Sequence, residues 1–413
     1  MISYKQLNNK DPEVVRLIKR EIKRQEEEIN LIASENYVSP AVLAAMSSVF
    51  TNKYSEGYSG KRYYGGNVVV DDLENLAIKR LKKLFKAEHA NVQPFSGSSA
   101  NAAVYMAFLQ PGDKVLGLKL DHGGHLSHGH PANFSGKLYN FIQYELDANG
   151  LIDMEQVREI AQREKPKMIV AGFSAYSREL DWKKFKEIAD EVSAYTFADI
   201  SHIAGLIAGG VLSSPVPYFD VVSATTHKTL RGPRGAFILC KKEFAQQVDR
   251  AVFPGIQGGP HNHINAAKAL AFKEALEPKF KKYCQQVIKN AQVMANRLMS
   301  LGYKIISSGT DNHLMVIDLR NKGINGLAAE QILEKISISV SRSTIPNDPA
   351  PAMKPSGIRI GSAAISTRGF KKAEVLLICD LINEAFLNKD NEIELLKLKK
   401  KVKNLCQRFP IYK

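Results

Sequence analysis

The segment TTHKTLRGPRG, residues 225–235, places three cations, Lys228, Arg231 and Arg234, in one short stretch with no acidic neighbour. It begins at the last residue of the apolar run VVSAT, and another apolar run, YTFAD, ends in Asp199. In a parallel sheet the carboxyl ends of the strands form the ligand-binding edge, so Asp199 and Lys228 can face one crevice. A buried ion pair is the simpler explanation of these two residues alone.

Two loops rich in small residues add the chemistry of phosphate binding. FSGSSAN (95–101) opens into the apolar run AAVYMAFL, so its backbone N–H groups would lie at a helix N-terminus, where anions bind. FPGIQGGP (253–260) can meet the same phosphate from another side or from another subunit. A lysine, an aspartate and two anion-binding loops together match pyridoxal 5'-phosphate. The lysine forms a Schiff base with this cofactor, and the aspartate keeps its pyridine nitrogen protonated.

The elements that must position these residues follow from the apolar pattern. Five short apolar runs predict buried strands: KVLGL (114–118), MIVAGF (168–173), YTFADI (195–200), VVSAT (221–225) and AFILC (236–240). Segments 152–163 and 182–193 have the periodicity of helices between them, and further amphipathic helices are predicted over 12–29 and 71–86. This alternation predicts an α/β fold with a mainly parallel sheet.

The pattern changes in the last third of the chain. Strands are predicted at YKIISS, HLMVIDL, ISISVS and GIRIG, with helices near 327–335 and 371–387 and a lysine-rich terminal helix. We therefore predict an N-terminal helical arm (1–25), a large cofactor-binding domain (26–277) and a smaller C-terminal α+β domain (278–413).

Composition narrows the class of protein. The 57 Lys and Arg residues against 42 Asp and Glu give a net charge of +15, which would suit a polyanionic partner, but many of the lysines lie on helical patterns such as 79–83 and 397–403. The four cysteines are far apart and form no CxxC pair, which indicates buried thiols in a reducing compartment. Because the chain shows neither a signal-peptide pattern nor a long apolar run, we expect a cytoplasmic protein without a membrane partner.

Nine motifs, in order along the chain, resemble those of serine hydroxymethyltransferase, a family of fold-type I pyridoxal phosphate enzymes. They are LIASENY (31–37), TNKYSEGYSGKRYYGG (51–66), NVQPFSGSSAN (91–101), DHGGHLSHG (121–129), GFSAYSRELDW (172–182), ADISHIAG (198–205), TTHKTLRGPRG (225–235), FPGIQGGPHNH (253–263) and PSGIRIGSAA (355–364).

The resemblance implies an activity and an assembly. The large domain would hold a mainly parallel sheet of the seven-stranded type. The enzyme would interconvert L-serine and tetrahydrofolate with glycine and 5,10-methylenetetrahydrofolate, in one-carbon metabolism and glycine and serine biosynthesis. It would be a homodimer with shared active sites, using pyridoxal phosphate as cofactor and tetrahydrofolate as co-substrate.

The resemblance also implies roles around the cofactor. Lys228 would carry it covalently, with His227 and Thr225 orienting the lysine and the phosphate. Asp199 would pair with the pyridine nitrogen. The other implied cofactor contacts are His202 and Ser174 near the ring oxygen, His125 stacked on the ring, Arg234 beside the cofactor, Ser96, Gly97 and Ser98 around the phosphate, and Tyr54, Gly258 and Gly259 from the partner subunit.

For the substrates, the resemblance assigns Arg359 to the amino-acid carboxylate, which an Arg fork binds bidentately, with Ser34 adding a hydrogen bond. Glu56 would be the acid-base group near the hydroxymethyl carbon, and Tyr64 would act beside it. The implied folate contacts are Glu56, Tyr63, Leu120, Gly124, His125, Leu126 and Ser343. The histidines of DHGGHLSHGH follow no metal-ligand spacing, so no metal site is predicted.

Departures from the family pattern keep other functions open. Phe95 stands where His or Tyr is usual, Ser59 replaces a Pro, and Ser341 and Ser343 stand where the family has Asn. Loss of an amide contact to the pteridine ring would weaken folate binding by ~1–3 kcal/mol. A second hypothesis is therefore a folate-independent aldolase or transaldolase acting on threonine or allo-threonine. A third, nucleic-acid binding through the +15 charge, we do not expect to be specific.

Overall fold

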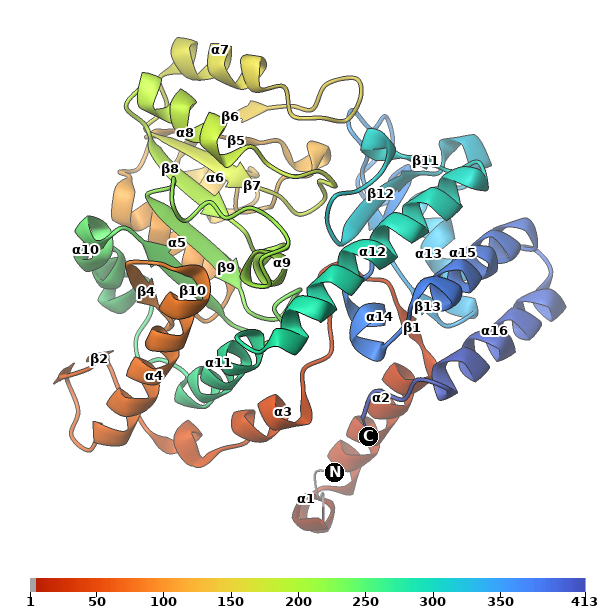
Figure 1. The fold of residues 1–413 in the computed structure, drawn as a ribbon, viewed down its shortest axis with the longest axis horizontal. Coiled ribbons are helices and arrows are strands. Elements are labelled where there is room, and N and C mark those ends of the chain that lie inside the picture. Colours follow the sequence, from red (N-terminus) through yellow and green to blue (C-terminus); the bar gives the residue numbers. More distant parts are fainter. Residues whose placement is uncertain (1–4, 413) are drawn as a thin grey trace. The chain divides into compact units, whose positions relative to one another are not determined.

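The computed structural model describes residues 5–412 (Figure 1). Contacts within the chain divide it into two compact units, Ala41–Gln285 on the one hand and Met1–Pro40 with Gln286–Lys413 on the other. The opening segment thus groups with the C-terminal part of the chain. The limits predicted from sequence, 1–25, 26–277 and 278–413, stay a prediction about domains.

The unit Ala41–Gln285 is built on a seven-stranded sheet with the order β4-β10-β9-β8-β7-β5-β6. Its strands are β4 (His89–Asn91), β5 (Lys114–Leu118), β6 (Asn140–Tyr144), β7 (Met168–Gly172), β8 (Tyr195–Asp199), β9 (Val221–Thr225) and β10 (Ala236–Cys240). β10 is antiparallel to both neighbours, and the remaining pairs are parallel. The predicted mainly parallel α/β fold is confirmed.

All five strands predicted for this sheet are present, and two further strands were missed. β4 has only three residues, and β6, NFIQY, carries polar residues and is buried fully only at Tyr144. Neither strand forms the continuous apolar run that signals a strand buried on both faces. Lys228 lies three residues beyond the end of β9, in the loop that follows it.

Helices cover this sheet and fix its loops. They are α3 (Pro40–Met46), α4 (Val68–Phe85), α5 (Gly97–Phe108), α6 (Phe134–Leu138), α7 (Met154–Glu164), α8 (Trp182–Glu191), α9 (Ala204–Ala208), α10 (Ala245–Arg250) and α11 (Asn262–Ala275). α5 packs against β8, β9 and β10, α8 packs against β7 and β8, and α4 pairs with α11 (Figure 1). A two-stranded hairpin, β2 (Gly57–Tyr58) and β3 (Lys61–Arg62), precedes α4.

The other unit holds an antiparallel sheet in the order β11-β12-β15-β14 and a parallel pair, β1 with β13. The strands are β1 (Ile29–Asn30), β11 (Lys304–Ile305), β12 (Leu314–Asp318), β13 (Ile338–Ser339), β14 (Ser341–Ser343) and β15 (Gly357–Gly361). The helices are α1 (Lys5–Lys10), α2 (Pro12–Glu27), α13 (Gly326–Lys335), α14 (Ala363–Arg368), α15 (Lys372–Leu387) and α16 (Glu392–Gln407), and α12 (Pro278–Ser300) crosses the division. The predicted strand YKIISS shortens to β11, because a 3-10 turn begins at Ile306 and Ser307 has a φ of 63°.

Two further expectations concern the whole chain. Among residues 5–412, no helix has the length and apolar character needed to cross a membrane. All four cysteines are buried and free, as predicted.

Candidate active site

Asp199 ends β8 and is buried among hydrogen-bond donors. Its Oδ2 accepts a hydrogen bond from Asn101 Nδ2 at 2.8 Å and lies 3.2 Å from His128 Nε2, while its Oδ1 accepts one from the Ser201 backbone N–H at 3.0 Å. Burial opposes ionisation, yet the contact with His128 and the charges of His128 and His125 hold the pKa of Asp199 well below its usual range. Asp199 is therefore an ionised acceptor that is fixed in place before any ligand arrives.

The donors around Asp199 are themselves held. Asn101 Nδ2 also donates to Ser127 Oγ at 2.8 Å, and Asn101 Oδ1 accepts from Ser223 Oγ at 2.6 Å. Sequence reasoning missed Asn101 and His128, although both lie inside the quoted motifs. The available signal was a polar Asn within the apolar face of a helix, since buried polar groups need partners.

One cluster bears on the prediction that the chain has no metal site. His125, His128 and Asp199 each offer a ligand atom, and these atoms lie within 4.8 Å of one another. Chain spacing did not reveal this set because Asp199 comes from a different strand loop than the two histidines. The absence of a metal site stays a prediction, and Asp199 can equally accept a hydrogen bond from a protonated ring nitrogen.

The loop after β9 gives its cations different surroundings. Lys228 is buried, whereas Arg234 is exposed and the Arg231 guanidinium lies 4.6 Å from the centre of the Tyr283 ring. His227 is mostly buried, and its Nδ1 has no hydrogen-bond partner among the described residues. Burial and the positive charges of Lys228 and Arg234 lower the pKa of His227 to about 3, so this imidazole is neutral at neutral pH.

The predicted phosphate cup lies at the N-terminus of α5. Ser96 is the N-cap, its Oγ accepting from the Ser99 N–H at 3.4 Å, and Ser96 and Ser98 are exposed. A Cβ on Gly97 would lie 2.7 Å from Thr225 Cγ2, so glycine allows the helix end to approach the end of β9. The exposed N-terminus of α5, its close approach to the end of β9 and the buried Nδ1 of His227 in the following loop fit a phosphate-bearing cofactor.

Two further side chains hold the segment that leads into the cup. Lys268 is fully buried on α11, and its Nζ donates to the carbonyl oxygens of Val92 at 2.5 Å and Pro94 at 3.0 Å. Burial lowers the pKa of Lys268 to about 7. Phe95, the departure next to the cup, stacks on His261 with ring centres 4.1 Å apart. No pattern in the sequence signals a role for Lys268, since a lysine on a helix usually faces water.

Other predicted cofactor and folate residues lie on neighbouring loops. His202 is buried, and its carbonyl oxygen accepts from Thr229 Oγ1 at 2.9 Å. Ser174 donates its backbone N–H to Gly123 O at 2.7 Å, which ties the loop after β7 to the loop after β5. That second loop contains Leu120, Gly124, His125 and Leu126.

Glu56 and the second glycine loop meet around an open hollow. A hollow of about 480 Å³ is lined by Glu56, Tyr63 and residues 253–258. A Cβ on Gly258 would lie 3.1 Å from Glu56 Oε1, and one on Gly259 would lie 3.2 Å from Tyr54 Cε1. The structure therefore brings these predicted residues together, with Tyr64 in edge contact with Tyr54 at 5.0 Å. A cavity of about 500 Å³ beside α4 and β10 contains none of the predicted site residues.

Arg359 and Ser34 belong to the other unit. Arg359 lies on β15 opposite Ser341, whose Oγ donates to Arg359 O at 3.2 Å and accepts from Arg359 Nη2 at 3.5 Å. The Gly361 N–H donates to Leu31 O at 2.7 Å, which places the segment leading to Ser34 against the end of the same strand. Burial lowers the pKa of Arg359 to about 10, so it remains charged at neutral pH.

One comparison with known proteins bears on these residues. A model of the family described as SHMT, serine hydroxymethyltransferase, matches residues 7–382 of the 413-residue chain. The match includes every predicted site residue, from Ser34 to Arg359. Members of this family are pyridoxal phosphate enzymes that use tetrahydrofolate as co-substrate, which agrees with an ionised Asp199, a buried lysine and an open helix N-terminus. The chain belongs to the serine hydroxymethyltransferase family.

Proposed function

We propose that the residues around Asp199 and Lys228 hold the cofactor with which this enzyme transfers a one-carbon unit between L-serine and tetrahydrofolate. The observation that carries the proposal is Asp199, which is buried and yet kept ionised by His128, Asn101 and the Ser201 N–H. A buried carboxylate of this kind suits one task well, which is to keep a neighbouring ring nitrogen protonated.

Each residue then has a task toward the cofactor. Bound pyridoxal phosphate supplies an electron sink. Lys228 would hold it covalently, Asp199 would accept the N–H of its ring nitrogen, and His125 would cover one face of its ring. The phosphate would lie at the N-terminus of α5, where Gly97 and Ser98 offer backbone N–H groups and the exposed Ser96 is the N-cap.

The substrate is bound and its proton moved by other side chains. Arg359 would bind the serine carboxylate with both arms of its guanidinium, and Ser34 would add a hydrogen bond. Glu56 would hold and move the proton at the hydroxymethyl oxygen. Tyr63 would line the folate side of the same hollow, which it shares with Glu56 in the structure.

We further propose a homodimer in which each chain supplies part of its partner's site. The support is a set of exposed large side chains that line or adjoin the hollow, comprising Tyr54, Tyr63, Tyr64 and Ile256. Large side chains exposed together in this way often mark an interface. Burying it against a second copy would place Glu56 and Tyr54 in the neighbouring active site.

Serine cleavage with and without tetrahydrofolate tests the proposed function. We expect glycine to form from serine only when tetrahydrofolate is present. We expect Lys228→Ala to remove the visible absorbance of the bound cofactor and this activity together, while the fold survives by circular dichroism. Arg359→Lys should raise the KM for serine by about 100-fold, or about 2.7 kcal/mol, and leave cofactor affinity unchanged.

A second candidate function rests on Ser343. Its Oγ donates to Thr344 O at 3.0 Å, so the hydroxyl is directed to its own strand end, where the family pattern has an amide. A folate-independent aldolase is the function this favours. Steady cleavage of allo-threonine together with no response to tetrahydrofolate would support the aldolase and contradict the transferase.

A further inference from the structure

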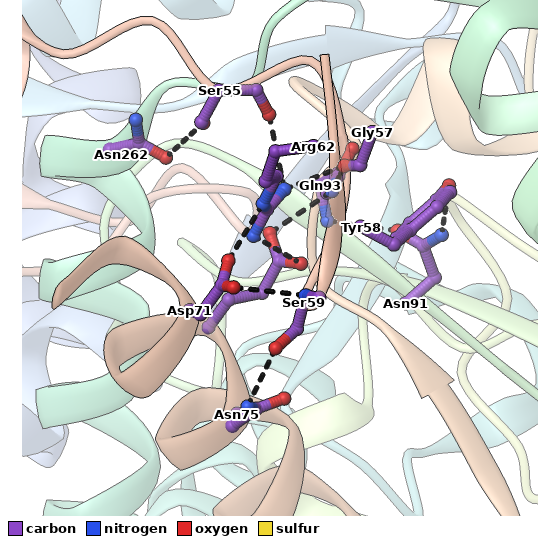
Figure 2. Close-up of polar contacts among 12 residues, drawn as sticks. Ser55, Gly57, Tyr58, Ser59, Arg62, Asp71, Asn75, Asn91, Gln93 and Asn262 are labelled. Carbon is purple, nitrogen blue, oxygen red and sulfur yellow. Dashed lines mark hydrogen bonds and ion pairs between the residues drawn. The ribbon is translucent and has the colours of Figure 1, made fainter. Parts of the chain in front are cut away.

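Arg62 holds the backbone on both sides of Glu56. Its Nη1 donates to the carbonyl oxygens of Ser55 at 3.1 Å and Gly57 at 2.6 Å, the two residues that flank Glu56 (Figure 2). The Glu56 carbonyl oxygen itself accepts from the Tyr63 N–H at 3.0 Å. Arg62, the last residue of β3, and Tyr63, which follows it, therefore bind the carbonyl groups of three successive residues, 55–57.

Two acids, the partly exposed Asp71 and the buried Glu74, fix the Arg62 guanidinium in turn. Its Nε donates to Asp71 Oδ1 at 2.8 Å and its Nη2 to Glu74 Oε1 at 3.1 Å, and both acids lie on α4. The side chain of Arg62 is 4% exposed and that of Glu74 is 2% exposed. A buried ion pair contributes little net stability, but its geometry is strict because every donor needs its acceptor.

The same cluster holds the rest of the turn. Gln93 Nε2 donates to both Gly57 O and Glu74 Oε2 at 3.0 Å. Asp71 Oδ2 accepts from the Gly60 N–H at 2.9 Å, so the tip of the hairpin is bound to the same helix. The turn also requires glycine at position 57, where φ is 95° and a Cβ would lie 2.3 Å from Lys61 O.

We propose that Arg62 is a positioning residue for Glu56, fixing the peptide groups on either side of it so that the carboxylate projects into the hollow at the angle that proton transfer requires. Arg62 does not line that hollow, whose wall includes Glu56 and Tyr63. It therefore acts through Glu56. This inference rests on the proposed acid-base role of Glu56.

A double-mutant cycle on the holoenzyme tests the proposal. The variants are Arg62→Gln, Glu56→Gln and the double substitution, with kcat measured for serine and tetrahydrofolate. We expect Arg62→Gln to lower kcat by about 10- to 100-fold, the range expected when a catalytic group is displaced by about 1 Å. In the Glu56→Gln background, Arg62→Gln should have no further effect, because the group it positions is already lost.

Hydrogen exchange supplies a readout besides activity. Amides of residues 55–63 should exchange faster in Arg62→Gln than in the parent enzyme. Arg80→Gln is the matched control, because Arg80 lies on α4 with Asp71 and Glu74 but donates to Ala269 O at 2.8 Å, away from the turn. It should leave both kcat and the exchange of 55–63 unchanged. If Arg62→Gln does not fold, Asp71→Asn can replace it, because it weakens one contact of Arg62. We expect it to lower kcat and to speed the exchange of residues 55–63, each by less than Arg62→Gln would.

The outcomes separate the two hypotheses. Equal loss of kcat from Arg62→Gln in both backgrounds would show that Arg62 acts independently of Glu56 and would overturn the inference. Unchanged exchange of residues 55–63 would overturn it as well. Unchanged kcat in Glu56→Gln would instead remove the acid-base role of Glu56, and the positioning role would fall with it.

Discussion

Two buried titratable side chains of the site, Asp199 and His227, reach opposite charge states for reasons that lie in their neighbours. Asp199 stays charged because donors surround both of its oxygens. His227 stays neutral because burial, Lys228 and Arg234 all oppose a further positive charge. Together they give the site one fixed negative charge and one neutral ring, which suits a cationic ring nitrogen beside an anionic phosphate.

The lowered pKa of His227 predicts acid sensitivity. In the folded apoprotein this pKa is about 3, whereas an unfolded histidine titrates near 6.5. Between these values only the unfolded chain binds the proton, so the contribution of His227 to stability is present above pH 6.5 and is lost as pH falls toward 3. Its slope is about 1.4 kcal/mol per pH unit.

Urea unfolding of the apoprotein between pH 4 and 6.5 measures this effect. His227→Asn should lower the slope of the unfolding free energy against pH by about 1.4 kcal/mol per pH unit, the effect of one bound proton. His130→Asn is a control, since His130 is another histidine of the chain that lies outside the loop after β9. An unchanged slope in His227→Asn would show that this imidazole is protonated in the folded protein.

At the scale of elements, the sequence predicted what depends on local pattern and missed what depends on packing. Strands β5, β7, β8, β9 and β10 are continuous apolar runs and were predicted, whereas the short β4 and the mixed β6 were not. Helix α4 begins at Val68, three residues before the predicted start, because Asp71 lies inside its first turn and Asn67 is the N-cap.

The same division holds for the site. Motifs supplied the positions of Lys228 and Asp199, and the structure places both at the edge of the sheet where strand ends meet ligands. They did not supply His128 or Lys268 as supports, because each contacts groups far away in the chain, nor Arg62, whose acceptors lie on the turn before it and on α4 after it. No spacing rule connects Lys268 of α11 with Val92, or Arg62 of β3 with Glu74 of α4, until these elements have packed.

The junction of α5 with β9 gives a prediction at this scale. Gly97→Ala would place a methyl group 2.7 Å from Thr225 Cγ2, so the first turn of α5 must move away from the end of β9. We expect cofactor affinity to fall by about tenfold, or about 1.4 kcal/mol. Titration of apoprotein with pyridoxal phosphate measures this. Gly117→Ala is the control, since its methyl would meet Phe141 at an ordinary 3.5 Å. Equal cofactor affinities for Gly97→Ala and the parent protein would contradict the proposed phosphate site at the N-terminus of α5.

For the whole molecule, the central question is which chain supplies Glu56. Glu56 and the loop 253–258 line an open hollow, and two large side chains of its lining, Tyr63 and Ile256, are exposed. A monomer would leave this surface in water. A symmetric dimer would cover this surface. Each active site would then contain Lys228 of one chain and Glu56 of the other.

Mixing two inactive variants decides this. In a heterodimer of Lys228→Ala with Glu56→Gln, a shared arrangement leaves one site with both native groups, each from a different chain. Random pairing makes half of the dimers mixed, so activity should return to about a quarter of the parent value. If each chain uses its own Glu56, every site keeps one defect and mixing restores nothing. Lys228→Ala mixed with Lys228→Arg is the control, since no pairing of those chains restores the lysine. Recovery in the first mixture alone would therefore establish that the active site is built from two copies of the chain.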